Sequence, residues 1–330
     1  MCVFKLKEVV YPMKSILLIL LAALLLFPCW GLSEETTGEA EVTVDVTESA
    51  EAPLVSNPLP IDFSGGFPPL AEGYEGDYYY EDPTIRVQIT YKETKEYIEG
   101  YRGRNMGYWV VDIQIGDASQ LRTAAAESFT TETTLPAQDI ASRVNAVVAI
   151  NGDYFARHKE GFAIRQGTLI RDKLKGNRDV LLIDEDGDFH VYHLPEKGEL
   201  TDTVDGKKVV NAFYFGPVLV ENGEVPKKFP SFTFLSPNKY YARLALCQVG
   251  ELHYKVILTT MEQDYTLGIR LKDFATLCQK EGAIIAYNLD GGLSTTLLFN
   301  NQRINEQKRV NFRSIPDIIY FASAWSGEEE

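Results

Sequence analysis

The residues best suited to chemistry follow an apolar run near the C-terminal end of the chain. The run ends in Asp290-Gly291-Gly292, and Ser294 and Thr295 precede a second apolar run. The segment offers a carboxylate, two glycines that can adopt a positive φ, and hydroxyls at a turn between two strands. Backbone N–H groups exposed in such a turn can bind an anion. An Asp-Gly pair between apolar runs is also typical of an ordinary β-hairpin, and this segment alone does not separate the two interpretations.

A second polar glycine segment lies in the middle of the chain. Asn151-Gly152-Asp153 ends an apolar run that begins at Ala146. The helical pattern predicts helices over residues 136–144 and 271–281, and an apolar strand follows each helix and leads into a glycine segment. Ligands collect at the carboxyl ends of strands in open sheets, so we expect both segments to line one pocket. A tight turn with an Asx hydrogen bond is the simpler interpretation of Asn151-Gly152-Asp153.

Short apolar and alternating runs that predict strands make up most of the remaining pattern. Turn signals such as Asp186-Gly187 and Asn222-Gly223 separate them. The predicted strands are residues 85–90, 108–115, 146–150, 180–183, 189–193, 209–215, 218–220, 241–249, 254–260, 283–289, 295–299 and 318–321. Many strands and few helices favour an α+β domain built on one large mixed or antiparallel sheet system with a few packed helices.

The formal net charge of −15 is concentrated near the N-terminus. Residues 15–85 contain 13 acidic residues and no Lys or Arg, the first 14 residues carry +2, and the last three residues are glutamates. Residues 86–327 therefore carry only −1. A nucleic-acid partner is excluded because it requires a basic surface. The hydrophobic content of 45% allows a sizeable core.

The N-terminus has the features of an export signal. Residues 15–27 form an uncharged, mostly apolar run behind Lys14, shorter than the roughly 20 residues that span a bilayer. Cys29 and Gly31 are spaced like the −3 and −1 positions of a cleavage site. We therefore predict a signal peptide over residues 1–31 and a protein that is secreted or held in the cell envelope. Retention as a membrane anchor and lipidation of Cys29 are the alternatives, so any membrane contact is made through this segment.

Composition divides the rest of the chain into three parts. Residues 32–80 are rich in Glu, Thr, Pro and Gly with few large aliphatic residues, which predicts an acidic disordered linker. Residues 81–325 form the predicted domain, and residues 326–330 form an acidic tail. Cys247 and Cys278 would be the only cysteines of the secreted form, either as a pair or as buried free thiols. The sequence does not specify the oligomeric state.

Seven segments, in their order along the chain, resemble the phosphodiester glycosidase domain family. They are AINGDYF (149–155), GFAIRQG (161–167), FGPVLVENGE (215–224), YYARLAL (240–246), LGIRLKDFATLCQKEGA (267–283), YNLDGGLSTT (287–296) and RSIPDIIYF (313–321). The resemblance covers about residues 85–322. The family includes the enzyme that uncovers mannose 6-phosphate by removing N-acetylglucosamine, together with many bacterial cell-envelope proteins. The resemblance implies a phosphodiester glycosidase-like fold and the activity of a hydrolase.

The chain departs from the usual family pattern at three places. Residues 151–155, Asn-Gly-Asp-Tyr-Phe, stand where the family usually shows Asn-Gly-Gly-Phe-Phe. Arg243 lies between Ala242 and Leu244 rather than in a Pro-Arg-Thr context. Residues 261–264, Met-Glu-Gln-Asp, stand where many members have Asp-Gly-Arg. This last departure removes a basic residue, so the sequence does not specify the identity of the substrate.

The resemblance implies cleavage of a sugar C1–O bond with a sugar phosphate monoester as the leaving group. Such a monoester has a second pKa of about 6 and departs as a stabilised anion, so a strong general acid is less necessary than in ordinary glycoside hydrolysis. Asp290 is then the expected catalytic carboxylate, as a nucleophile or as a base for water, and Asp153 the second carboxylate that orients water or sugar hydroxyls. Arg243 and Arg313 would clamp the phosphate, because a guanidinium binds phosphate oxygens bidentately.

Further substrate contacts are expected from both glycine segments. The predicted substrate-binding residues are Asn151, Gly152, Asn288, Gly291, Gly292, Ser294, Thr295 and Arg313. The sequence contains no zinc-ligand spacing, GxSxG elbow or phosphate P-loop, and no cofactor is expected. A Ca²⁺ or Mg²⁺ ion held by Asp153 and Asp290 is compatible with these residue types.

Two other functions stay open, and both have a carbohydrate partner. One is a non-catalytic envelope protein that binds polysaccharide or serves exopolysaccharide biosynthesis, which the missing Asp-Gly-Arg arginine favours. The other is a glycosidase that acts on polysaccharide without phosphate. In that case Asp153 or Glu262 would serve as the acid.

Overall fold

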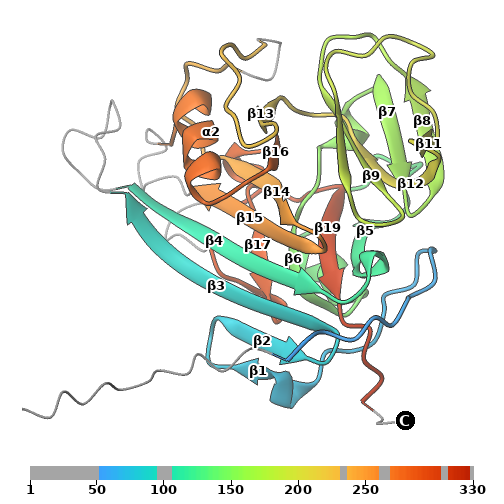
Figure 1. The fold of residues 1–330 in the computed structure, drawn as a ribbon, viewed down its shortest axis with the longest axis vertical. Helices are drawn as coiled ribbons and strands as arrows, with labels where there is room; N and C mark the ends of the chain where they lie inside the picture. Colours follow the sequence, from blue (N-terminus) through green and yellow to red (C-terminus); the bar gives the residue numbers. More distant parts are fainter. Residues whose placement is uncertain (1–51, 95–105, 231–235, 260–267, 306–310, 328–330) are drawn as a thin grey trace, which may run out of the picture. The chain divides into compact units, whose positions relative to one another are not determined.

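The computed structural model describes residues 52–94, 106–230, 236–259, 268–305 and 311–327. These residues form three β-sheets with two short α-helices packed on them, as Figure 1 shows. Every pairing between the strands is antiparallel. The α+β class predicted from the sequence, with antiparallel sheets and few helices, is confirmed.

The first sheet has eight strands and extends in Figure 1 from β1 and β2 near the bottom to β16 and β13 beside α2. In spatial order its strands are β1 (Tyr74–Glu75), β2 (Tyr79–Asp82), β3 (Ile85–Thr94), β4 (Met106–Ile115), β15 (His253–Thr259), β14 (Leu244–Gly250), β16 (Ile285–Asn288) and β13 (Val218–Val220). β4 alternates buried and half-buried residues at both of its ends, as expected for a strand with one face against the core. β16 carries the chain into the Asp290-Gly291-Gly292 turn.

The second sheet has six strands and lies at the upper right of Figure 1. Its strands are β10 (Phe189–Tyr192), β9 (Val180–Asp184), β12 (Lys207–Phe213), β7 (Gly161–Arg165) and β8 (Thr168–Lys173) in spatial order, with β11 (Thr203–Val204) paired to β12. β7 and β9 are buried along their whole length, whereas β8 at the edge is mostly exposed.

The third sheet contains the strand that leads into the other glycine segment. Its spatial order is β18 (Gln302–Arg303), β17 (Leu297–Phe299), β6 (Ala146–Asn151), β19 (Asp317–Ala322) and β5 (Leu121–Ala125). All residues of β6 and β19 are buried, because both faces of these central strands are covered. β6 ends at Asn151, so the first glycine segment follows directly from the core.

The helices and short 3-10 turns complete the fold. They are α1 (Ala137–Ala141), α2 (Leu271–Lys280), η1 (Ala71–Gly73), η2 (Ala118–Gln120), η3 (Phe155–Arg157) and η4 (Gly292–Ser294). Both α-helices lie where the sequence predicts them, although α1 is shorter than expected. α2 buries the face formed by Leu271, Phe274, Ala275 and Cys278 and packs on β13 and β16. Gly282, with φ of +89°, follows the end of α2.

The expected linker differs from the structure in its second half. Leu59 is buried in the core, and the strand β2 pairs with β3. The buried guanidinium of Arg122 donates to the carbonyl oxygens of Pro60, Asp62 and Ser64 at 3.0–3.1 Å. Residues 52–80 therefore belong to the folded unit, because they supply acceptors for a buried charge and apolar side chains for the core. The prediction of a disordered linker that reaches residue 80 is wrong for these residues.

Three other predictions concern the termini and the cysteines. The predicted signal peptide, residues 1–31, the first part of the linker up to residue 51, and residues 328–330 of the acidic tail lie outside the described residues. No helix in the described ranges has the length and apolar character needed to cross a membrane. Cys247 and Cys278 are both buried as free thiols, which is one of the two states that the sequence leaves open.

Candidate functional site

The two glycine segments, 139 residues apart in the chain, meet through the side chain of Asn151. Its Nδ2 donates to the backbone carbonyl of Asp290 at 2.8 Å, and its Oδ1 accepts from the backbone N–H of Thr296 at 2.9 Å. Asn151 is only 1% exposed. β6 and β16 belong to different sheets. This amide therefore fixes the end of β6 in the third sheet against the turn that follows β16 in the first sheet. The two segments therefore meet, as predicted, and their lining of one pocket stays a prediction.

Glycine is required at three positions for steric reasons. A Cβ on Gly291 would collide with the carbonyl oxygen of Ala242, and a Cβ on Gly152 would collide with the carboxylate of Asp317. Gly292 has φ of +62°, which other residues adopt only with strain. The glycines predicted to bind substrate thus have a packing role that allows the backbone to approach its neighbours closely.

Asp153 lies in a buried ion pair. Its Oδ1 is 2.7 Å from Nη2 of Arg165, and its Oδ2 accepts from the backbone N–H of Tyr214 at 2.8 Å. Arg165 is fully buried, lies 4.5 Å from the ring centroid of Phe213, and also approaches Asp317 at 3.5 Å. Both oxygens of Asp153 are therefore engaged by donors within the protein.

Asp290 has a different environment, because its side chain is only half-buried. Burial raises the pKa of Asp290 to about 6, and the nearby charge of Asp153 acts in the same direction. Hydrogen bonds from the Ser294 hydroxyl and the Gly291 N–H, together with the charge of Arg313, oppose this rise in the pKa. A pKa of about 6 lies close to neutral pH, in the range typical of a carboxyl group that transfers protons.

Arg313 is an exposed guanidinium beside Asp290. Its Nη1 donates to the Ser294 Oγ at 3.5 Å, and its Cζ lies 5.6 Å from the ring centroid of Tyr154. Its backbone N–H donates to the carbonyl of Leu293 at 2.9 Å, which holds the segment before β19 against the turn. A cation is thus available next to Asp290 for an anionic group of a substrate.

Arg243 lies beside the same turn, but its guanidinium binds backbone carbonyls of other loops. Its Nε donates to Ile269 O at 3.3 Å, and its Nη2 donates to Ser236 O at 3.3 Å and Lys239 O at 3.1 Å. Burial lowers the pKa of Arg243 to about 10. The preceding carbonyl, of Ala242, accepts from Gly292 N at 2.9 Å. These contacts give Arg243 a role in holding loops around the turn, and its place in a phosphate clamp stays a prediction.

Two of the other predicted residues present buried polar atoms with no hydrogen-bond partner among the described residues. They are the Oδ1 of Asn288 and the Oγ1 of Thr295. The Nδ2 of Asn288 donates to Gly216 O at 2.8 Å. Buried polar atoms are rarely left unsatisfied, so these two are candidates to contact a bound molecule or water.

The structure adds Arg165, Asp317 and His158 to the residues around the site. Burial raises the pKa of Asp317, Arg165 lowers it, and Asp153 raises it further. Burial and the charge of Arg178 lower the pKa of His158 to about 4, so its imidazole is neutral at physiological pH. Arg165 and Asp317 lie inside segments that carry the family resemblance, and this position is the sequence signal that could have identified them. Nothing in the sequence distinguishes His158 from an ordinary buried histidine.

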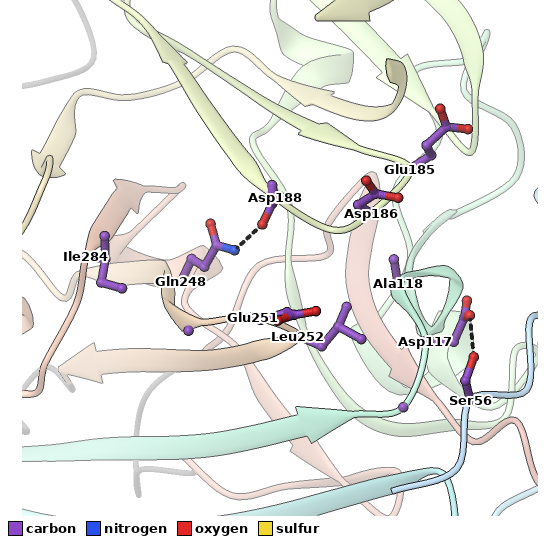
Figure 2. Close-up of a pocket in the computed structure, with 12 residues that line it drawn as sticks. Ser56, Asp117, Ala118, Glu185, Asp186, Asp188, Gln248, Glu251, Leu252 and Ile284 are labelled. Carbon is purple, nitrogen blue, oxygen red and sulfur yellow. Dashed lines mark hydrogen bonds between the residues drawn. The ribbon is translucent and has the colours of Figure 1, made fainter. Parts of the chain in front are cut away.

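Two cavities of about 600 and 490 Å³ are lined by other residues. Figure 2 shows the larger one, whose acidic lining residues are Asp117, Glu185, Asp186, Asp188 and Glu251. Two of these carboxylates are hydrogen-bonded within the lining, Asp188 to Gln248 and Asp117 to Ser56. Neither cavity includes Asp153, Asp290 or an arginine predicted to bind phosphate.

A divalent cation between the two aspartates does not fit this arrangement well. Both oxygens of Asp153 already accept from Arg165 and Tyr214 N. Across the described ranges, no group of three or more His, Cys, Asp or Glu side chains is arranged to hold a metal ion.

Comparisons with known proteins agree on one family. The sequence model of the phosphodiester glycosidase family matches residues 144–322, more than half of the chain. The SPbeta prophage-derived uncharacterized protein YomE of Bacillus subtilis is 28% identical over 185 residues. That alignment covers 54% of this chain and 28% of YomE, so the chain spans little more than a quarter of that relative.

Two solved structures share the fold. The catalytic domain of zebrafish N-acetylglucosamine-1-phosphodiester alpha-N-acetylglucosaminidase, auto-inhibited by its pro-peptide, superposes with a TM-score of 0.58 at 16% identity, covering 73% of this chain and 84% of that one. A hypothetical protein from Synechocystis superposes with a TM-score of 0.51 at 17% identity, covering 72% and 62%. With the family match over residues 144–322 and the site at the ends of β6 and β16, the chain belongs to the phosphodiester glycosidase family.

Proposed function

We propose that this protein hydrolyses the glycosidic bond of a sugar-1-phosphodiester, with Asp290 as the reactive carboxylate. The family supports a glycosidase-type hydrolase. The observation that carries the finer proposal is the pairing of a half-buried Asp290 with the exposed cation of Arg313, linked through the Ser294 hydroxyl. A substrate that combines an electrophilic sugar C1 with an adjacent phosphate anion matches these two groups.

The reaction requires little from a general acid. The C1–O bond breaks with its electron pair moving to the phosphate oxygen, and the phosphate monoester leaves as an anion. Asp290 either attacks C1 as a nucleophile or accepts a proton from the water that attacks it. Water finally supplies the hydroxyl on C1. Arg313 stabilises the negative charge on the phosphate group, which grows as the bond breaks.

Asp153 has a supporting role in this proposal. Because its carboxylate is held by Arg165 and Tyr214 N, it is fixed in place rather than free to attack. Its negative charge raises the pKa of Asp290. Asn288, Ser294 and Thr295 lie beside the turn and offer amide and hydroxyl groups to sugar hydroxyls or phosphate oxygens. Asn151 supports the site indirectly, because its amide already binds Asp290 O and Thr296 N. The identity of the sugar is left to experiment.

Export is the second part of the proposal. The apolar run at residues 15–27, followed by small residues, supports an exported protein that acts on cell-envelope or extracellular glycans. Expression of the full chain with a C-terminal tag, followed by cell fractionation and N-terminal sequencing, tests it. A tagged protein found only in the cytoplasm with an intact N-terminus would contradict export.

The activity is tested with synthetic N-acetylhexosamine-1-phosphodiesters in water enriched in ¹⁸O. Wild type should release an unlabelled phosphate monoester and a free sugar that carries ¹⁸O at C1, because the sugar C1–O bond is the one that breaks. Asp290→Asn should lower kcat by at least about 100-fold, whereas Asp202→Asn, an exposed aspartate in the second sheet region, should retain it. ¹⁸O in the phosphate would indicate a phosphodiesterase instead. If folded wild type binds glycan without turnover, the alternative function of a non-catalytic polysaccharide-binding protein is favoured.

A further inference from the structure

Tyr154 has a backbone conformation that a tyrosine rarely adopts. Its φ of 63° and ψ of 29° lie in the left-handed region, between Asp153 and the start of η3. Left-handed non-glycine residues cluster at functional sites, where the surrounding structure compensates for the strain. Asp153 and Phe155, on either side, are buried, whereas the Tyr154 ring is only half-buried. The bend thus separates the inward carboxylate of Asp153 from a ring that reaches the surface of the site.

The ring of Tyr154 lies between two groups of the site. One is the guanidinium of Arg313, 5.6 Å from the ring centroid, and the other is the imidazole of His158, at 5.7 Å in an edge-to-face arrangement with an interplanar angle of 81°. An aromatic face within about 6 Å of a guanidinium attracts it through the ring quadrupole. Tyr154 therefore provides a surface on which the Arg313 side chain can rest.

Arg313 has few other contacts that fix its position. Its hydrogen bond to Ser294 is long, at 3.5 Å, and no carboxylate of the described residues forms an ion pair with it. An exposed arginine without a rigid partner samples many rotamers. In the structure the guanidinium of Arg313 nevertheless lies near enough to Asp290 for its charge to lower the pKa of that carboxyl group. The face of the Tyr154 ring restrains the Arg313 guanidinium, which its hydrogen bonds do not hold in place.

We propose that Tyr154 is a positioning residue, whose ring face holds the Arg313 guanidinium beside Asp290, where a substrate phosphate binds. The inference rests on the proposed function, because the phosphate is the anion expected at that position. The charged groups that act on Asp290 are Asp153 in the loop after β6, Asp317 at the start of β19, and Arg313 before β19. Of these, only Arg313 is exposed and free to change its distance from Asp290.

Two substitutions separate the ring face from simple packing. Tyr154→Phe keeps the aromatic face and removes only the hydroxyl. Tyr154→Leu keeps apolar bulk and a similar backbone cost but has no ring face. The Leu variant should lower kcat/KM for the 1-phosphodiester about 3- to 30-fold, and the Phe variant should remain within about twofold of wild type. Tyr192→Leu, a half-buried tyrosine of β10 away from the site, controls for the loss of a ring.

The coupling between the two residues gives a second readout. In an Arg313→Ala background, Tyr154→Leu should cause little further loss, because the group that it positions is absent. An equal loss in both backgrounds would show that the ring acts on something else. Wild-type kcat/KM in a folded Tyr154→Leu variant would overturn the proposal directly.

A third readout does not depend on turnover. Titration of the ¹³C-labelled aspartate carboxyl groups by NMR, with Asp290→Asn to assign the resonance, reports the pKa of Asp290. Tyr154→Leu should raise this pKa, because Arg313 no longer stays close enough to lower it, and Tyr154→Phe should not. An unchanged titration in the Leu variant refutes the positioning role. Absence of hydrolysis by wild type, with the titration shifted as expected, would refute the proposed function instead.

Discussion

Asp290 and Asp317 are both carboxyl groups whose pKa burial raises, but only one of them can meet a substrate. Asp317 is fully buried beside Arg165, and its Oδ1 has no hydrogen-bond partner among the described residues. Asp290 is half-buried and faces the exposed guanidinium of Arg313. Accessibility therefore favours Asp290 over Asp317 as the carboxylate of the proposed reaction, whereas Asp317 contributes its charge near Asp153 and Arg165.

The first prediction concerns the stability of Asp290→Asn. Because the folded state raises the pKa of Asp290 from 3.8 to about 6, the unfolded chain ionises first, and the free energy of unfolding falls as pH rises through this window. Above pH 6, Asp290→Asn should be more stable than wild type by about 1–3 kcal/mol, and near pH 4 the difference should become small. Urea unfolding at both pH values measures this. A variant less stable than wild type at pH 7 would contradict it.

The second prediction concerns the pH dependence of activity. If Asp290 acts as an anion, kcat/KM should decline below about pH 6, where the carboxyl group is protonated. Ser294→Ala removes a hydroxyl that lowers this pKa, so the acidic limb should move to higher pH, and the loss should be greater at pH 5.5 than at pH 8. Thr276→Ala on α2 is the control. If the acidic limb of the pH profile does not move, Asp290 is not the group whose protonation lowers activity.

At the scale of elements, the site depends on where the neighbouring strands β6 and β19 of the third sheet end and begin. β6 stops at Asn151, and β19 begins at Asp317, with Ile318 opposite Asn151 in the antiparallel register. The backbone N–H of Gly152 donates to the Asp317 carbonyl at 3.2 Å. This pairing brings the Asp317 carboxylate against Gly152, where it approaches the same Arg165 guanidinium that binds Asp153.

A third prediction follows from this close approach. Gly152→Ala would place a methyl group against the Asp317 carboxylate and should destabilise the fold by about 1–3 kcal/mol, with a loss of activity as the Arg165 network shifts. Gly250→Ala is a matched control, because its Cβ would meet only ordinary contacts and its φ is not in the left-handed region. Chemical denaturation compares the two. Equal stability of both variants would show that the carboxylate can move without cost.

For the molecule as a whole, the segment before β3 decides where the folded unit begins. Ala52–Glu330 forms one compact unit. Within it, residues 52–82 supply the acceptors of the buried Arg122 guanidinium and the strand that pairs with β3. A sequence that looks like an acidic spacer thus contributes to the core through a few widely spaced apolar and carbonyl groups.

The fourth prediction compares two truncated chains. A chain that starts at Ala52 should unfold at the same temperature as the full chain, because it keeps the whole compact unit. A chain that starts at Glu81 should lose about 3 kcal/mol or more, since Arg122 would remain buried without the carbonyls of residues 60–64. Calorimetry measures both. Equal melting temperatures would show that the segment only lies on the surface.

The sequence by itself predicted most of the strands, both helices, the family and the two segments that end in Asn151-Gly152-Asp153 and Asp290-Gly291-Gly292. It missed the strands β1, β2, β5, β7, β8, β11 and β18. The predicted features follow from local periodicity and from residue order, which a single chain displays directly. Only the tertiary structure decided which guanidinium meets which carboxylate. Asp153 pairs with Arg165, and Arg243 binds loop carbonyls, because side-chain partners are chosen by distance in space across sheets. Burial, which raises the pKa of Asp290, is likewise a property of the assembled fold.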